Sequence, residues 1–293
     1  AQLAGLEQTQ STHAQQLAGL HEASERLRTQ ADVLRRRVAA AGEAPPAGAR
    51  SAALAPAPMP AVALDDTEAA VDTWLVSQAF RGTEEALGDR QRQYVPHFAG
   101  RRDVLDIGCG RGEFLLLLRE AGIAARGVDS DRDMALWCQE KGLDVTCTDA
   151  LTYLAHQPEA SLGGIFCAQV AEHLATPDLL RFIHLAHRAL RPDGLLLIET
   201  LNPESLLVLY RWFWVDLTHE RLVHPETLKF VLQSCGFRDI DLHFVPPPDG
   251  PLRLPLLELP GAPPEGLARF NAATQYLNDL LYGSFDYAVM GIR

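Results

Sequence analysis

Long apolar runs are absent from this chain, although 47% of its 293 residues are hydrophobic. We therefore expect no transmembrane segment. Basic residues are in the minority, because 26 Lys and Arg stand against 38 Asp and Glu, a formal net charge of −12. Such a surface does not attract the phosphates of DNA or RNA, so we expect no nucleic-acid partner.

Cysteine is scarce, and the sequence contains no C-x-x-C pair among its five cysteines. They stand at Cys109, Cys138, Cys147, Cys167 and Cys235. Most fall in segments expected to form core strands or helices, so we interpret them as small buried hydrophobic residues in a reducing compartment. No signal peptide is visible, and we expect a cytoplasmic protein that reaches the inner face of the membrane only through partners.

The most informative segment is VLDIGCGRGEF, residues 104–114. Its first four residues are apolar enough to predict a buried strand, and its end predicts the start of a helix. Between them, Gly108, Gly110 and Gly112 leave the backbone bare, so that a ligand can approach it beside the N-terminus of the helix. Ordinary tight turns share this glycine pattern, so the strands and helices predicted after it must show whether it binds a ligand.

Further strands follow at the spacing of a parallel sheet. We predict strands at 125–130, 143–147, 164–168 and 195–199, with helices at 131–141 and 178–190. Asp129 ends the second strand about twenty residues after the glycines, where doubly wound folds place a ribose-binding acid. The alternation predicts an α/β fold with an open, doubly wound sheet that binds ligands at the carboxyl ends of its strands.

The first forty residues follow a different pattern. From Leu3 to Val38, seam positions recur at alternating spacings of three and four, which predicts a coiled-coil helix over residues 1–40. A single amphipathic helix that lies on the protein is the alternative. Residues 41–63 are rich in Ala and Pro and predict an extended linker. We expect one main domain over residues 64–293, which closes with a strand at 238–245, a helix at 265–281 and a last strand at 285–292.

The motifs of residues 64–293 resemble those of class I S-adenosylmethionine-dependent methyltransferases. The resemblance rests on Gly108-Cys109-Gly110, on Asp149-Ala150 and on the Glu-His-Leu that begins at Glu172. It implies a Rossmann-like sheet of seven strands in which the last strand runs antiparallel between its neighbours. A hydride-transferring dehydrogenase shares the first strand–helix–strand unit, but these three motifs favour the methyltransferase.

The resemblance also implies which residues bind S-adenosylmethionine. Along the chain they are Asp106, Gly108, Cys109, Gly110, Gly112, Asp129, Ser130, Asp149, Ala150 and Gln169. The first five would hold the amino-acid end of the cofactor. Asp129 would accept from its ribose hydroxyls, and Asp149 with Ala150 would face its adenine. Arg81 and Tyr94 are further candidates for contact with its carboxylate or with the methyl acceptor.

Polar residues after the fourth strand suggest the chemistry. Glu172 and His173 follow that strand, and His219 and His224 stand in the later motif DLTHERLVHPETL. In one mechanism, His173 or His219 is the general base for a hydroxyl acceptor, and Glu172 orients the ring.

In a second mechanism, a divalent metal such as Mg or Mn lowers the pKa of neighbouring acceptor hydroxyls. This idea follows from a resemblance to the small-RNA 2′-O-methyltransferases, whose Glu-x-x-Glu-His motif and distal His hold magnesium. The resemblance implies Glu172, His173 and His224 as ligands. Gln169 replaces the first Glu of the motif and weakens such a site. His224, which precedes Pro225, is alternatively a cap for a helix at 225–234.

The segment from 199 to 219 suggests the acceptor. Trp212, Phe213 and Trp214 stand close to Asp216 and His219, a mixture that suits the faces and hydroxyls of sugars. The phrases FRG (80–82), ETLNP (199–203), DLTHER (216–221), HPETL (224–228) and DYAV (286–289) resemble bacterial methyltransferases of surface-polysaccharide (O-antigen or capsule) assembly. The resemblance implies methylation of a glycan or lipid-linked glycan at its chain end. It also implies a coiled coil that self-associates or docks a glycosyltransferase.

Two alternatives stay open from the sequence. A small-molecule O-methyltransferase acting on a quinone or a phenol also carries Glu-His-Leu after the fourth strand. A non-enzymatic scaffold would keep the fold and dock partners through its coiled coil. The intact glycine loop, Asp129 and Asp149 favour an enzyme over the scaffold.

Overall fold

The structure, a computed structural model, describes residues 82–245, 253–259 and 263–293. The coiled coil expected at 1–40, the linker at 41–63, the domain boundary at 64 and Arg81 all lie outside these ranges. Among the described residues, no helix is long and apolar enough to cross a membrane.

Seven strands form one sheet in the order β3-β2-β1-β4-β5-β7-β6. They are β1 (Val104–Ile107), β2 (Ala125–Asp129), β3 (Val145–Cys147), β4 (Leu162–Ala168), β5 (Leu190–Leu201), β6 (Arg238–Phe244) and β7 (Asp286–Ile292). The last strand, β7, lies between β5 and β6 and runs antiparallel to both, whereas the other described pairs are parallel. The predicted seven-stranded fold is therefore confirmed.

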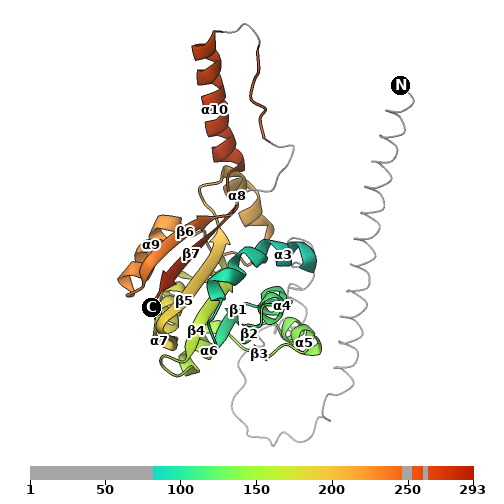
Figure 1. Cartoon of the computed structure of the whole chain (residues 1–293), viewed down its shortest axis with the longest axis vertical. Coiled ribbons are helices and arrows are strands. Elements are labelled where there is room, and N and C mark those ends of the chain that lie inside the picture. Colours follow the sequence, from blue (N-terminus) through green and yellow to red (C-terminus); the bar gives the residue numbers. More distant parts are fainter. Residues whose placement is uncertain (1–81, 246–252, 260–262) are drawn as a thin grey trace, which may run out of the picture. The chain divides into compact units, whose positions relative to one another are not determined.

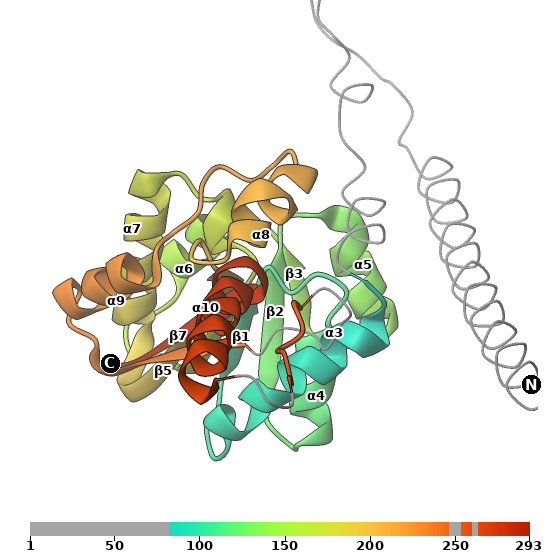
Figure 2. The same ribbon diagram turned by 90° about the horizontal axis from the view of Figure 1, so that it is seen from above.

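Helices connect the strands and cover both faces of the sheet. They are α3 (Glu84–Gln91), α4 (Glu113–Glu120), α5 (Arg132–Glu140), α6 (Ala150–His156), α7 (Thr176–Ala189), α8 (Leu206–Tyr210), α9 (Pro225–Ser234) and α10 (Pro264–Tyr282). Short 3-10 helices are η1 (Arg92–Phe98), η2 (Ala171–His173) and η3 (Trp212–Val215). In Figures 1 and 2, α7 and α9 lie on the opposite side of the sheet from α3 and α4.

Strand residues alternate between two apolar layers. On one side of β1, Leu105 packs in a cluster that includes Phe182 of α7 and Leu232 of α9. On the other side, Val104 packs with Phe98 and Phe114. Because both faces of the central strands are covered, successive positions in these strands are buried, which explains the continuous apolar runs in the sequence.

Side chains at the strand ends start several helices. Asp131 accepts from the Asp133 and Met134 amides and caps α5, and Asp149 accepts from the Thr152 amide and caps α6. His224 accepts from the Glu226 amide at 3.3 Å and caps α9, as the helix-cap interpretation of that residue predicted. These caps satisfy amide groups that have no partner inside the helix.

The fifth strand begins earlier than predicted. Leu190 pairs with Leu162 of β4, and the next pair in register is Leu195 with Gly164. The residues between them form an excursion within β5, in which Asp193 has a φ of 65°. The Pro-Asp-Gly signal therefore marks a bulge inside the strand and not its beginning.

The start of α4 depends on a glycine in a crowded place. Gly112 has a φ of 83°, and a Cβ there would lie 2.5 Å from Leu143 Cδ1 and 2.9 Å from Cys138 Sγ. Gly122 has a similar φ of 70°, but a Cβ there meets nothing within 4 Å. The two positions therefore share the backbone strain and differ in crowding.

We predict that Gly112→Ala lowers the free energy of unfolding by about 1–3 kcal/mol more than Gly122→Ala, because the added methyl group overpacks the contact between the start of α4, helix α5 and the segment before β3. Urea denaturation of both variants measures the difference. Equal losses would mean that crowding at Gly112 has no energetic effect.

Candidate active site

A cavity of about 310 Å³ opens at the carboxyl ends of the central strands. The loop after β1, the end of β4, helix α3 and the segment 212–219 all contribute to its wall. Its described lining includes Asp106, Gly108, Cys109, Gly110, Arg111, Glu113, Phe166, Gln169, Glu172, His173, Trp212, His219 and Asp286. The structure therefore brings the glycine loop and the predicted catalytic residues to one cavity.

The glycine loop is held against the end of β2. Gly108 and Gly110 have positive φ values of 66° and 52°, and a Cβ at Gly108 would lie 2.4 Å from Val170 Cγ2. The Gly110 amide donates to Asp129 Oδ2 at 2.8 Å, and the Asp131 amide donates to Asp129 Oδ1 at 2.9 Å. This carboxylate therefore fixes the loop, and it lies at the end of β2, outside the described cavity lining.

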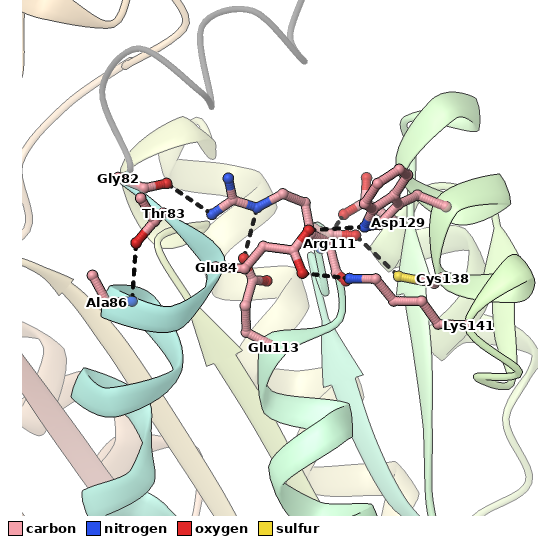
Figure 3. Close-up of polar contacts among 11 residues, drawn as sticks. Gly82, Thr83, Glu84, Ala86, Arg111, Glu113, Asp129, Cys138 and Lys141 are labelled. Atoms are coloured by element: carbon pink, nitrogen blue, oxygen red, sulfur yellow. Dashed lines mark hydrogen bonds and ion pairs between the residues drawn. The ribbon is translucent and has the colours of Figure 1, made fainter. Parts of the chain in front are cut away.

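A buried guanidinium lies next to the loop, and the sequence analysis missed it. Arg111 is 2% exposed, and its Nε lies 2.7 Å from Glu113 Oε1. Its Nη2 donates to the Gly82 carbonyl at 3.1 Å, so the side chain joins the loop to the segment before α3 (Figure 3). The only sequence signal was an Arg and a Glu on either side of Gly112, a pair that more often lies on the surface.

A second contact ties the same two segments together. Lys141 Nζ lies 2.6 Å from Glu84 Oε2 and donates to the Arg111 carbonyl at 3.0 Å. Trp137 donates to the other oxygen of Glu84 at 3.0 Å. Glu84 belongs to α3, Trp137 belongs to α5, and Lys141 is the residue after the last turn of α5. The start of α3 and the end of α5 therefore meet beside the glycine loop (Figure 3).

Burial raises the pKa of two groups at the end of β1 and in the loop after it. Burial first, and then the charges of Glu113 and Asp129, raise the pKa of Asp106 well above its usual value. A hydrogen bond with Cys138, together with burial, raises the pKa of the Cys109 thiol. Cys109 is therefore a neutral packing residue and not a nucleophile.

Glu172, His173 and His219 form one polar cluster. Their ligand-capable atoms lie within 4.8 Å of one another. Glu172 is fully buried, and its Oε2 accepts from the Thr200 hydroxyl at 2.8 Å. The Glu172 carbonyl also accepts from the Glu220 amide at 2.8 Å, which draws the segment after η3 back over the end of β4.

Backbone carbonyls orient both imidazoles. His173 Nδ1 donates to the Thr218 carbonyl at 3.2 Å, and His219 Nδ1 donates to the Phe213 carbonyl at 2.7 Å. A carbonyl only accepts, so each neutral ring carries its proton on Nδ1 and its lone pair on Nε2. This is the tautomer that a general base or a metal ligand needs.

Asp216 stabilises the same segment. Its partial burial opposes ionisation, but two hydrogen bonds from Thr218 and the nearby imidazoles of His173 and His219 hold its pKa below the usual value. The Thr218 hydroxyl donates to Asp216 at 2.6 Å and lies 2.9 Å from His173 Nδ1. The Asp-x-Thr-His motif therefore positions both histidines.

A buried acidic pair lies on the other side of Gln169. This residue has a φ of 56°, and its amide donates to Glu199 at 3.3 Å and to Asp286 at 3.1 Å. Arg90 lies 3.0 Å from the second oxygen of Asp286. Burial and the charge of Glu199 raise the pKa of Asp286 to about 6, although Arg90 and Gln169 act in the opposite direction.

Other predicted site residues lie elsewhere. Ser130, Asp149 and Ala150 follow β2 and β3 and are not part of the described cavity lining, and Asp149 caps α6. His224 lies apart from the Glu172 cluster, because it caps α9 and its Nε2 lies 3.4 Å from Glu204. Tyr94 is 1% exposed and packs against Phe166 of the lining, but it is not itself part of the described lining.

Residues 75–242 match the family described as a methyltransferase domain. The chain belongs to this methyltransferase family. A SAM-dependent methyltransferase from Archaeoglobus fulgidus is 37% identical, with a TM-score of 0.73 over 76% of this chain and 100% of that one. This chain is therefore an enzyme that uses S-adenosylmethionine.

Curated relatives of the methyltransferase include two named ubiquinone biosynthesis O-methyltransferase. One, from Hydrogenovibrio crunogenus, is 24% identical over 56% of this chain and 75% of its own length. The other, from Idiomarina loihiensis, is 28% identical over 48% of this chain and 64% of its own length. Neither name refers to a polysaccharide, so the predicted glycan acceptor gains no support from them.

The residues of the methyltransferase fit its cofactor. The bare backbone at Gly108 forms a cradle that a Cβ would fill, since it would collide with Val170. Asp106, Gly108 and Gly110 line the cavity and suit the amino-acid end of the cofactor. Asp129 ends β2, the position at which doubly wound folds place an acid for a ribose.

We predict that Asp286→Asn gains stability over the wild type as the pH rises. The folded pKa of Asp286 is about 6 and its unfolded value is 3.8, so the folded state retains a proton that the unfolded chain releases. The contribution of Asp286 is therefore present below pH 3.8 and lost as the pH passes 6. Integrated over this window, the change is about 1–3 kcal/mol.

Denaturation at several pH values between 4 and 8 measures this difference. Asp144→Asn, a change at an exposed residue, is the matched control. A constant difference between Asp286→Asn and the wild type would contradict the assignment.

Proposed function

We propose that this enzyme methylates a hydroxyl group of a small ring-shaped acceptor, of the phenol or quinone type. The carrying observation is the single cavity that joins the glycine loop to the cluster of Glu172, His173 and His219. The names of the two ubiquinone relatives support the same class of acceptor. When bound, S-adenosylmethionine supplies an electrophilic methyl group on a sulfonium.

The cavity wall suits a flat and neutral acceptor. Phe166, Leu201, Trp212, Val215 and Phe285 provide apolar surface for the faces of a ring. Carboxylates outnumber guanidinium groups in the described lining, where Asp106, Glu113, Glu172, Asp216 and Asp286 face Arg90 and Arg111. An anionic acceptor would be repelled, so the acceptor enters protonated and the enzyme removes its proton.

The histidine cluster supplies the means to remove that proton. Both imidazoles present Nε2 lone pairs, because their Nδ1 protons are held by the Thr218 and Phe213 carbonyls. In the simpler version of the proposal, one of these nitrogens accepts the hydroxyl proton, and the buried carboxylate of Glu172 stabilises the resulting imidazolium.

The same cluster also fits a divalent cation, and we favour this version. Glu172, His173 and His219 would be the ligands, with His219 in place of His224. Imidazole rings that donate their Nδ1 proton to backbone carbonyls are typical of metal ligands. The excess of carboxylates in the wall favours a cation. When bound, the ion supplies Lewis acidity that lowers the pKa of an acceptor hydroxyl.

A glycan acceptor is the second candidate, and one observation favours it. Tyr210 and Trp214 are 83% and 69% exposed on the segment that forms the rim of the cavity. Exposed aromatic rings can stack on sugars, and the neighbouring carboxylate of Asp216 can accept from their hydroxyls. The acceptor experiment below separates the two candidates.

We expect labelled methyl groups from S-adenosylmethionine to appear on a catechol such as 3,4-dihydroxybenzaldehyde, and not on lipid-linked glycan from the source organism. Scintillation counting after extraction measures both products. Label on the glycan alone would replace the small-molecule acceptor by the glycan. Label on neither, with normal binding of S-adenosylhomocysteine, would refute both acceptors.

We predict that EDTA abolishes methyl transfer and that Mn²⁺ restores it. His219→Gln should weaken Mn²⁺ binding by about tenfold or more, because a ligand is lost. His224→Gln is the matched control and should leave Mn²⁺ binding unchanged, since His224 caps α9. Titration calorimetry measures binding independently of activity. Full activity in EDTA, with no Mn²⁺ binding, would leave the imidazoles as general bases only.

A further inference from the structure

The glycine loop carries a buried cation, Arg111, that has no part in the proposed methyl transfer. Arg111 lines the cavity, and its side chain is 2% exposed. Nε is paired with Glu113, and Nη2 donates to the Gly82 carbonyl. Nη1 is also buried, and it has no hydrogen-bond partner among the described residues. A buried guanidinium nitrogen without an acceptor is costly, which points to a missing anionic partner.

The cofactor carries one anionic group. S-adenosylmethionine has a sulfonium and an ammonium, both positive, and a single carboxylate. The carboxylates of the wall suit the two positive groups, and Asp106 stands at the end of β1 beside the loop. The carboxylate, by contrast, needs a cation in a wall where carboxylates are in excess.

Two arginines of the described lining are candidates for that cation. Arg90 lies 3.0 Å from Asp286 and 3.8 Å from Glu199, and its side chain is 45% exposed. Its charge is therefore already shared between two carboxylates. Arg111 has one carboxylate partner, at Nε, and it stands within the glycine loop itself. The geometry favours Arg111.

We propose that Arg111 binds the carboxylate of S-adenosylmethionine through Nη1. Glu113 and the Gly82 carbonyl bind the Nε and Nη2 atoms of the guanidinium, so the side chain is already oriented before the cofactor binds (Figure 3). The inference goes beyond the proposed function, because it does not depend on which acceptor is methylated.

Arg111 also links cofactor binding to the segment before α3. The Arg111 guanidinium donates to the Gly82 carbonyl, and the Lys141 ammonium donates to both the Glu84 carboxylate and the Arg111 carbonyl. A carboxylate on Nη1 would thus complete a network that already joins α3, α4 and α5. We expect the cofactor to stabilise this part of the chain when it binds.

The test compares S-adenosylmethionine with decarboxylated S-adenosylmethionine, which lacks only the carboxylate. Calorimetry on the full chain gives both affinities without any turnover. Arg111→Gln should weaken binding of S-adenosylmethionine by about 10- to 100-fold, the range expected for a charged hydrogen bond. Its effect on the decarboxylated compound should stay below about threefold.

Matched variants keep the outcome clear. Arg111→Gln leaves Glu113 buried without its partner, so the double variant Arg111→Gln/Glu113→Gln removes the charge imbalance and should show the same selective loss. Arg90→Gln should retain the preference for the carboxylate. Equal losses for both compounds would reduce Arg111 to a structural role. Loss of the preference in Arg90→Gln or Arg81→Gln instead would assign the carboxylate to that arginine.

Discussion

The parallel register of β1 with its two neighbours is the constraint on which the site depends. Ile107, at the end of β1, lies level with Val128 of β2 and Cys167 of β4. The three strands therefore stop at nearly the same height, and the segments that follow them converge. The glycine loop, Asp129 and Gln169 are neighbours for this reason alone, although they are distant in the sequence.

The residues at this edge are held by strain and by buried charge. Gln169 adopts a left-handed backbone conformation, which is unfavourable for residues other than glycine. This conformation persists because the side-chain amide of Gln169 donates hydrogen bonds to Glu199 and Asp286. The acidic pair is in turn tolerated because Arg90 offsets part of its charge. Glycine at position 169 would remove the backbone strain, and apolar residues at 199 and 286 would remove the buried charge. The presence of the costlier residues indicates a binding site.

Local signals in the sequence predicted most of the fold. Asp131 stands just before its helix, and Pro225 follows a cap, so these two helix starts could be read directly. Asp149 also caps a helix, but the sequence analysis assigned it only to the cofactor. Apolar runs predicted the central strands because both faces of the sheet are buried. The predicted start of β5 at residue 195 was wrong, because the Pro-Asp-Gly sequence lies within a bulged strand that begins at Leu190.

The site was predicted less completely, because its residues meet through tertiary contacts. His219 and His224 are equally plausible partners of Glu172 by spacing, and only the return of the chain over Glu172 selects His219. Arg111 gave only a weak sequence signal, its pairing with Glu113 across Gly112, because a charged residue in a glycine turn normally points to solvent. Its burial follows from Gly82 and Glu113, which lie on different segments.

The placement of β7 has a consequence for how the enzyme is made on the ribosome. This strand is the last of the seven to be synthesised, yet it lies inside the sheet, between β5 and β6. Until it emerges, β5 has a bare edge and β6 has no partner in the sheet. Asp286, at its first position, also belongs to the cavity wall. The nascent chain therefore completes its sheet and its binding site in the same late step, and no earlier intermediate carries a finished cavity.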